Sequence, residues 1–199
     1  MKPLHTDSEH LHRLLDGMAN AVAANGYAET TIADVVRLAG VSRRTFYEQF
    51  ATKAECFFAL YEAASRNALK VLRHGIDPAH DWHTQLEQAL TAYFGCLAQN
   101  PVLMRTLFIE ILGLGPQGLA VRRRINQELA DFMLQVVNAG SAESADGDGG
   151  KPAALLSADM AMAVVGGVNE LVLQAIECDR VNAMQELVAP TLQLIRAVT

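Results

Sequence analysis

Apolar residues recur at intervals of three and four along most of the chain, which is the spacing of one face of an α-helix. The first such stripe lies between Leu11 and Val22, and Asn25-Gly26 ends it because glycine readily adopts the left-handed conformation that follows a helix. No segment alternates with the period of a β-strand. The pattern therefore predicts an all-α protein of about nine helices. The further helices are expected over about 32–39, 43–50, 53–74, 82–97, 101–111, 116–136, 155–178 and 184–195.

Three interruptions shape this pattern. Residues 138–152, rich in glycine, serine and aspartate, are predicted to form a flexible loop, and Pro190 is predicted to kink the last helix. Residues 155–176 form the longest apolar stretch, but Asp159 and Glu170 interrupt it, together with one serine and two amides. A membrane span does not normally carry such residues, so we expect a protein helix without contact to a membrane.

Short side chains that cap helices stand at regular places between positions 31 and 55. Thr31 with Asp34 and Thr52 with Glu55 have the spacing of capping boxes, and Ser42 is a third N-cap candidate. They delimit two short helices joined by a turn that contains Gly40. This arrangement is typical of a helix-turn-helix, whose second helix enters the major groove of DNA.

The second short helix has the chemistry for that task. Its phenylalanines, one turn apart, are expected to face inward, which leaves Arg43, Arg44 and Tyr47 on the opposite face. Arginine binds guanine through two hydrogen bonds, and threonine contacts a thymine methyl group or a phosphate. The formal net charge of the chain is −6, yet residues 37–53 carry three arginines and one lysine against Glu48 alone. This segment is thus net +3 and the rest −9, a distribution that orients a protein on DNA.

Residues 40–50 (GVSRRTFYEQF), followed by residues 52–55 (TKAE), resemble the signature of the TetR family of transcriptional regulators. The stretch 21–31, with its Asn-Gly-Tyr, is similar to the end of that family's first helix, and the resemblance covers roughly residues 11–60. It implies a three-helix DNA-binding domain over residues 1–53. It further implies a ligand-binding and dimerisation domain over residues 54–199, joined to the first by a long helix. The protein would be a homodimeric repressor that a small-molecule effector releases from a palindromic duplex operator.

The resemblance also assigns roles to single positions. Base contacts are expected from Arg43, Arg44 and Thr45. Phosphate contacts are expected from Thr31, Tyr47, Gln49 and Lys53. Ala33 is a departure from those members that place a base-contacting arginine at its position, because alanine cannot make such a contact.

The C-terminal part offers candidates for an effector cavity and for a dimer interface. The cavity candidates are the large apolar residues Tyr93, Phe94, Met104, Phe108, Phe132 and Met133, with Gln99, Arg105, Glu110 and Asn126 as polar residues able to orient a ligand. For each apolar residue, a place in the ordinary core is the alternative. The interface candidates, in a four-helix arrangement with two helices from each subunit, are Met162, Val165, Gly166, Leu187, Thr191 and Ile195. For the helix over residues 155–176, a fully internal position is the alternative.

Other functions receive less support from the sequence. We find no nucleophile elbow, no glycine-rich phosphate loop and no paired metal-ligand motif on a helix, so we expect neither an enzyme nor a cofactor. His80 and His83 are interpreted as surface residues because a third metal ligand is missing. Cys56 or Cys96 is a candidate redox sensor, against the alternative of a buried structural thiol. Sparse cysteines and an N-terminus without an apolar segment predict a cytoplasmic protein. A helical module that binds another protein remains the alternative function.

Overall fold

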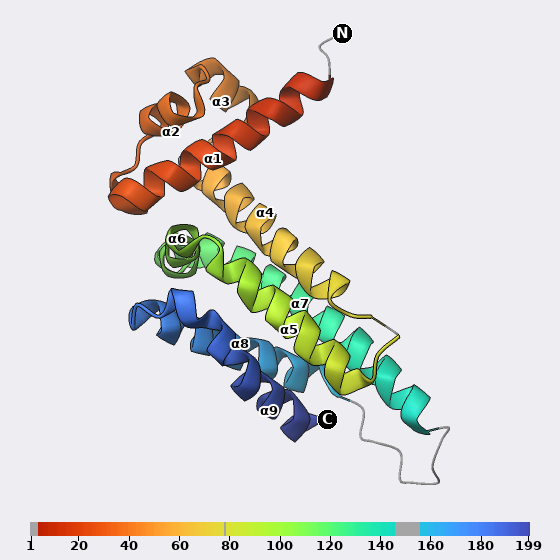
Figure 1. Ribbon diagram of the computed structural model, residues 1–199. Helices are drawn as coiled ribbons and strands as arrows, with labels where there is room; N and C mark the ends of the chain where they lie inside the picture. The colour runs from red at the N-terminus through yellow and green to blue at the C-terminus, as the bar shows by residue number, and fades with distance from the viewer. Residues whose placement is uncertain (1–3, 78, 146–155) are drawn as a thin grey trace. The chain divides into compact units, whose positions relative to one another are not determined.

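The computed structural model describes residues 4–77, 79–145 and 156–199, and within these residues it contains helices and no strand (Figure 1). The helices confirm the all-α prediction. They are α1 (Leu4–Glu29), α2 (Ile32–Ala39), α3 (Arg43–Gln49), α4 (Lys53–His74), α5 (Trp82–Ala98), α6 (Pro101–Gly113), α7 (Gly115–Ala145), α8 (Ala158–Glu177), the 3-10 helix η1 (Val181–Leu187) and α9 (Val188–Val198).

The chain packs as two compact units, one of residues 1–66 and 102–121, the other of residues 67–101 and 122–199. The first unit holds α1 to α3, the beginning of α4 and most of α6. The second holds the end of α4, α5, η1, α8 and α9 with the larger part of α7. The predicted functional division at residue 53 falls inside the first unit, at the start of α4.

In the first unit, α2 and α3 lie on the same side of α1 (Figure 1). Gly17 allows the close approach of α1 and α2, because a Cβ atom there would lie 2.6 Å from the carbonyl oxygen of Val35. The core includes Leu14, Phe46 and Phe57, all fully buried. As predicted, the helical conformation of α1 is broken at Gly26, which has φ 76° and ψ 161°.

In the second unit, α8 and α9 pack against each other, and α5 packs against η1 and α9. Asp81 caps α5 by accepting hydrogen bonds from the backbone N–H groups of His83 and Thr84, both at 3.1 Å. Asn169 and Asn126 are buried and joined by a 3.0 Å hydrogen bond from Nδ2 to Oδ1, which ties α8 to α7.

Two sequence predictions about helix ends were wrong. Residues 138–145, predicted as part of a loop, continue α7 to Ala145, and residues 146–152 lie outside the described part of the chain. Pro190 does not kink the last helix, because it stands in the first turn of α9, where its missing N–H costs no hydrogen bond. The non-helical residue lies earlier, at Ala183 within η1, which has φ −104° and ψ 19°.

One helix among the described residues, α8, is long and apolar enough by length and composition to cross a membrane, with a mean hydropathy of 1.3. Core helices of globular proteins have the same length and hydropathy, so these two properties do not identify a membrane-spanning helix. Here α8 contributes seven buried residues to the second unit, including the hydrogen-bonded Asn169. We interpret it as a core helix with one exposed side.

The three cysteines differ in access, and this sets their reactivity. Cys56 is fully buried, and burial raises the pKa of its thiol to about 12, whereas Cys178 is exposed. Because the thiolate is the reactive form, we expect a thiol reagent at pH 7.5 to modify Cys178 quickly and Cys56 only after unfolding. Mass spectrometry of peptides from native and denatured protein checks this. Rapid native labelling of Cys56 would contradict its placement and restore it as a redox-sensor candidate.

Candidate nucleic-acid interface and effector cavity

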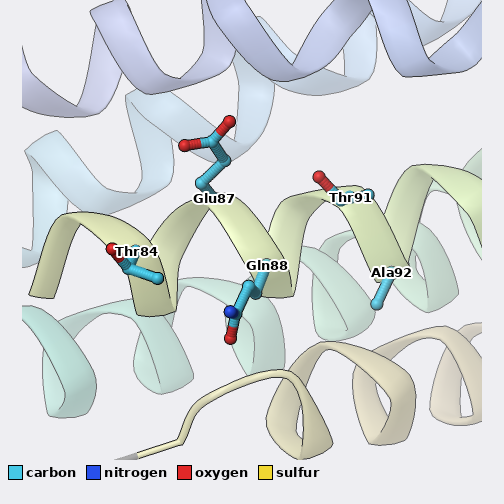
Figure 2. A pocket seen from close by; sticks show the side chains of 5 residues that line it. All are labelled: Thr84, Glu87, Gln88, Thr91 and Ala92. Carbon is cyan, nitrogen blue, oxygen red and sulfur yellow. The ribbon is translucent and has the colours of Figure 1, made fainter. Parts of the chain in front are cut away.

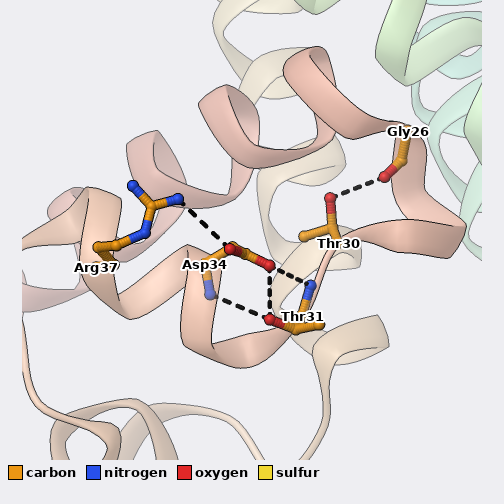
Figure 3. Close-up of polar contacts among 5 residues, drawn as sticks. All are labelled: Gly26, Thr30, Thr31, Asp34 and Arg37. Atoms are coloured by element: carbon orange, nitrogen blue, oxygen red, sulfur yellow. Dashed lines mark hydrogen bonds and ion pairs between the residues drawn. The ribbon is translucent and has the colours of Figure 1, made fainter.

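The N-terminus of α2 is fixed by the capping box that the sequence predicted (Figure 3). The backbone N–H of Asp34 donates to Oγ1 of Thr31 at 3.2 Å, and the backbone N–H of Thr31 donates to Oδ2 of Asp34 at 3.1 Å. The Thr31 hydroxyl also donates to Oδ2 of Asp34 at 2.6 Å, and this bond is the main reason why the pKa of Asp34 is lowered. The box is therefore complete above the ordinary titration range of aspartate and weakens as the pH falls through the lowered pKa.

The turn between α2 and α3 is held from α1 by Arg13, a residue that the sequence analysis missed. Its Nε donates to the carbonyl oxygen of Ala39 at 2.9 Å and its Nη2 to that of Gly40 at 2.6 Å. Gly40 has φ 61°, and a Cβ atom there would lie 2.6 Å from Nη2 of Arg13. The turn thus needs glycine both for its backbone conformation and for access of the guanidinium group.

The orientation of α3 follows from its cap and its buried side. Oγ of Ser42 accepts a 3.0 Å hydrogen bond from the backbone N–H of Thr45. Phe46 is fully buried, and its ring centroid lies 5.8 Å from that of Phe50. The opposite face carries Arg43 and Arg44, both exposed, and Tyr47 with 57% of its surface exposed. These side chains are presented together, as the sequence predicted.

The remaining predicted DNA contacts differ in how accessible their polar groups are. Thr45 and Gln49 are half-buried at the edge of the exposed face, and Thr45 shares a 2.9 Å hydrogen bond with the Ser42 hydroxyl. Arg44 forms an ion pair with Glu48 at 3.2 Å, with 89% of the arginine side chain exposed. Such an exposed pair contributes little to stability and opens readily for a phosphate or a base.

Lys53 has a structural role that the sequence did not indicate. Its Nζ donates to the carbonyl oxygens of Tyr27 and Thr30 at 2.7 Å and of Ala28 at 3.3 Å, and it lies 4.2 Å from the centroid of the Tyr27 ring. The three N–H donors of the ammonium group are therefore engaged at the end of α1. Because the Thr31 hydroxyl is likewise engaged with Asp34, we leave Thr31 and Lys53 out of the proposed DNA contacts.

The replacement Lys53→Met, which keeps an unbranched side chain but removes the ammonium group, is expected to lower the free energy of unfolding by about 1–3 kcal/mol, because three carbonyl oxygens lose a charged donor. Thermal unfolding monitored by circular dichroism measures the change. Lys70→Met is the matched control, since Lys70 is exposed on the same helix. An equal effect of the two replacements would show that the Lys53 contacts contribute nothing.

The bend at Gly26 has a second partner in α6. Oε1 of Glu110 accepts a 3.1 Å hydrogen bond from the backbone N–H of Tyr27. Glu110 therefore satisfies an N–H group that the broken helix leaves without an internal acceptor. A single glutamate in an amphipathic helix gives no sequence signal for this contact, which joins residues 83 positions apart.

An apolar cavity of about 60 Å³ lies in the second unit, between the end of α4 and helices α5, α7, α8 and α9. Of the predicted cavity residues, Tyr93, Phe132 and Met133 line it. Phe94 is fully buried in the core instead, and Met104 and Phe108 are on α6, in the other unit. Thr191 and Asn169 also line the cavity. The sequence placed Thr191 in the dimer interface and did not select Asn169.

Two further hollows of the second unit are open to solvent. One, of about 470 Å³, is lined by five residues of a single face of α5 (Figure 2): Thr84, Glu87, Gln88, Thr91 and Ala92. The other lies at the end of α4 and includes Asn67, Lys70 and His74. The first is lined by α5 alone and the second by α4 and α5, whereas residues from five helices line the apolar cavity. His80 and His83 are exposed as predicted, and the described residues include no cluster of three metal-ligating side chains.

Four of the six predicted dimer-interface residues are buried inside the second unit, which corrects that prediction. Val165, Leu187, Thr191 and Ile195 expose 8% or less of their surface, and three of these four line the cavity. Met162 and Gly166 retain partial exposure. The exposed side of α8 instead carries Met160, Ala163 and Glu170, next to Gly166.

Comparisons with known proteins agree with this architecture. Residues 14–60 match the family model "Bacterial regulatory proteins, tetR family". The fold is that of TetR-like regulators.

The individual proteins of similar fold share few identical residues with this chain. A TetR-family regulator from Syntrophomonas wolfei superposes with a TM-score of 0.77 at 15% identity, covering 94% of this chain and 95% of the other. The fatty acid degradation regulator FadR of Bacillus halodurans gives a TM-score of 0.75 at 16% identity, covering 92% and 96%. FadR of Bacillus subtilis in complex with stearoyl-CoA gives 0.71 at 20% identity, covering 92% and 96%.

In sequence, the fatty acid metabolism regulator protein of Bacillus subtilis is 22% identical over 121 residues. This alignment spans 61% of either chain.

Proposed function

We propose that this protein is a sequence-specific repressor that binds duplex DNA as a homodimer and leaves it when an apolar effector occupies the second unit. The observation that carries the proposal is α3, where a capped, buried helix presents two exposed arginines and a tyrosine on one face. The proposed base contacts are Arg43, Arg44 and Thr45, and the proposed phosphate contacts are Tyr47 and Gln49. In this proposal the protein catalyses no reaction and acts in the cytoplasm.

Dimer formation is proposed through the exposed side of α8 together with α9. Small residues at Ala163 and Gly166 allow close approach of a second helix, because Ala163 is exposed and a Cβ atom at Gly166 would meet no atom within 4 Å. The high mean hydropathy of α8, 1.3, suits a helix whose exposed side is covered by a second subunit. A two-fold dimer presents two α3 helices, and these enter successive major grooves when they lie roughly 34–36 Å apart. The operator is then a palindrome.

The effector is proposed to be a mainly apolar molecule. Nine of the eleven residues that line the cavity are hydrophobic or aromatic. A relative of similar fold was solved with stearoyl-CoA, which makes acyl compounds the first class to test. The present cavity, at about 60 Å³, is too small for a stearoyl chain, so a long ligand requires the helices to separate. An effector that prefers this wider state shifts the population away from the DNA-binding spacing.

Footprinting of the purified chain on the DNA upstream of its own gene tests the proposal. We expect a protected palindrome whose half-sites are one helical turn apart, retained at low salt and lost at high salt. Addition of acyl compounds of increasing length should reduce the protection. Absence of salt-dependent retention on any duplex would reject DNA binding and favour a protein-interaction module.

A further inference from the structure

The hydroxyl group of Thr191 is buried without a hydrogen-bond partner. Thr191 exposes 1% of its surface, and within the described residues its Oγ1 is the buried side-chain polar atom for which no partner is found. A buried hydroxyl without a partner is costly, because it has given up its bonds to water. In a helix whose neighbours are apolar, such a group indicates a partner that the protein itself does not contain.

The position of this hydroxyl identifies where that partner lies. Thr191 lines the apolar cavity, opposite aromatic and aliphatic residues from α5 and α7 such as Tyr93 and Phe132. Asn169 adds a second polar side chain to the wall, and its amide is oriented by the buried hydrogen bond to Asn126. The cavity therefore combines a hydrophobic wall with three side chains that carry an uncharged polar group, Tyr93, Asn169 and Thr191, and among these the Thr191 hydroxyl has no partner.

The charge of the lining restricts the ligand further. The eleven lining residues include no lysine, arginine, histidine, aspartate or glutamate. An ionised group placed here would be desolvated without a counter-charge, which is strongly unfavourable. The volume of about 60 Å³ has room for roughly four to six water-sized groups. The inner end of the ligand must therefore be compact and neutral.

We propose that Thr191 binds an uncharged oxygen of the effector, so that the ligand part held in this cavity is a compact apolar group carrying an alcohol or a carbonyl. This proposal rests on the proposed function in one respect only, namely that the bound molecule acts as the effector. The binding step itself involves the second unit alone and is measured without DNA. Failure of ligand binding would leave the DNA-binding proposal standing, and the reverse also holds.

Cyclopentanol and methylcyclopentane are suitable probes, because each has six non-hydrogen atoms and the two differ by a hydroxyl in place of a methyl group. NMR titration of the full chain gives a dissociation constant for each probe, and the ratio of the two constants measures how strongly the protein recognises the oxygen. We expect Thr191→Val to shift this ratio at least tenfold towards methylcyclopentane. Thr191→Ser keeps the hydroxyl and is expected to retain the wild-type ratio within about twofold.

Thermal stability separates this role from a structural one. Thr30 is equally buried, but its hydroxyl donates to the carbonyl oxygen of Gly26 at 2.8 Å (Figure 3). Thr30→Val is therefore expected to lower the unfolding temperature and leave the ligand ratio unchanged, whereas Thr191→Val without ligand should be at least as stable as the parent. The proposal is overturned if the parent binds neither compound or if Thr191→Val leaves the ratio of dissociation constants unchanged. It is also overturned if Thr191→Ser does not retain the wild-type ratio, or if Thr191→Val is less stable than Thr30→Val.

Discussion

Replacement of both Arg43 and Arg44 by alanine is expected to abolish specific recognition of the operator. Each arginine is exposed on α3 and can form two hydrogen bonds to a guanine, an interaction that contributes about 1–3 kcal/mol of discrimination. Each single replacement should therefore weaken operator binding roughly 5- to 150-fold, and the double replacement more than either. Fluorescence anisotropy with the footprinted operator and with a scrambled duplex measures both affinity and preference.

A matched control for this experiment is Arg66→Ala. Arg66 pairs with Glu62 at 3.2 Å, also four positions apart on one helix, but on α4 and with the order of acid and base reversed relative to Arg44 and Glu48. Its loss removes an i, i+4 ion pair and one positive charge without touching α3. We expect it to leave the preference for the operator unchanged. If the arginine variants of α3 behaved like Arg66→Ala, α3 would not be the base-contacting helix.

Gly166→Arg is expected to convert the dimer to a monomer and to lower operator affinity by about 10²- to 10⁴-fold, because the two DNA-binding domains no longer act as one bivalent unit. The unit itself should tolerate the change. A Cβ atom at Gly166 would meet no atom within 4 Å, and arginine has the higher helix propensity. In the proposed interface, however, a long charged side chain would separate two closely packed helices. Analytical ultracentrifugation measures the assembly.

Gly113→Arg provides the control, because a Cβ atom at Gly113, on α6, likewise meets no atom within 4 Å. We expect this variant to remain dimeric and to bind the operator as the parent does. A dimeric Gly166→Arg protein with undiminished operator affinity would exclude this side of α8 from the interface.

The parts of the fold that the sequence predicted are those controlled by neighbouring residues. Thr31, Ser42 and Gly40 fix the ends of α2 and α3 through bonds within three or four positions, and the structure contains all of them. The burial of Phe46 opposite the exposed arginines follows from helical periodicity. The amino-acid composition of residues 138–145 gave a wrong prediction. These residues are rich in small polar side chains, which predicts a loop, yet they continue α7.

The candidate site was predictable in part for the same reason. The exposed face of α3 depends on one short helix, and the sequence placed it correctly. The role of Lys53 depends on the carbonyl groups that end α1, more than twenty positions away, and the clamp of Arg13 on Gly40 spans 27 positions. Neither contact leaves a local pattern. The sequence around a lysine or arginine on a helix surface is the same whether the side chain contacts solvent, DNA or a carbonyl oxygen.

The amino-acid sequence by itself determined the all-α class, the helix-turn-helix and the face of α3 that carries the arginines, since each depends on helical periodicity and on caps a few residues away. Only the tertiary structure decided which side of α8 and α9 is inside. Both helices are apolar over so much of their circumference that periodicity cannot distinguish a core face from an interface. Packing placed Thr191 and Ile195 against the cavity rather than at the surface, and with them the unpaired hydroxyl from which the ligand chemistry is inferred.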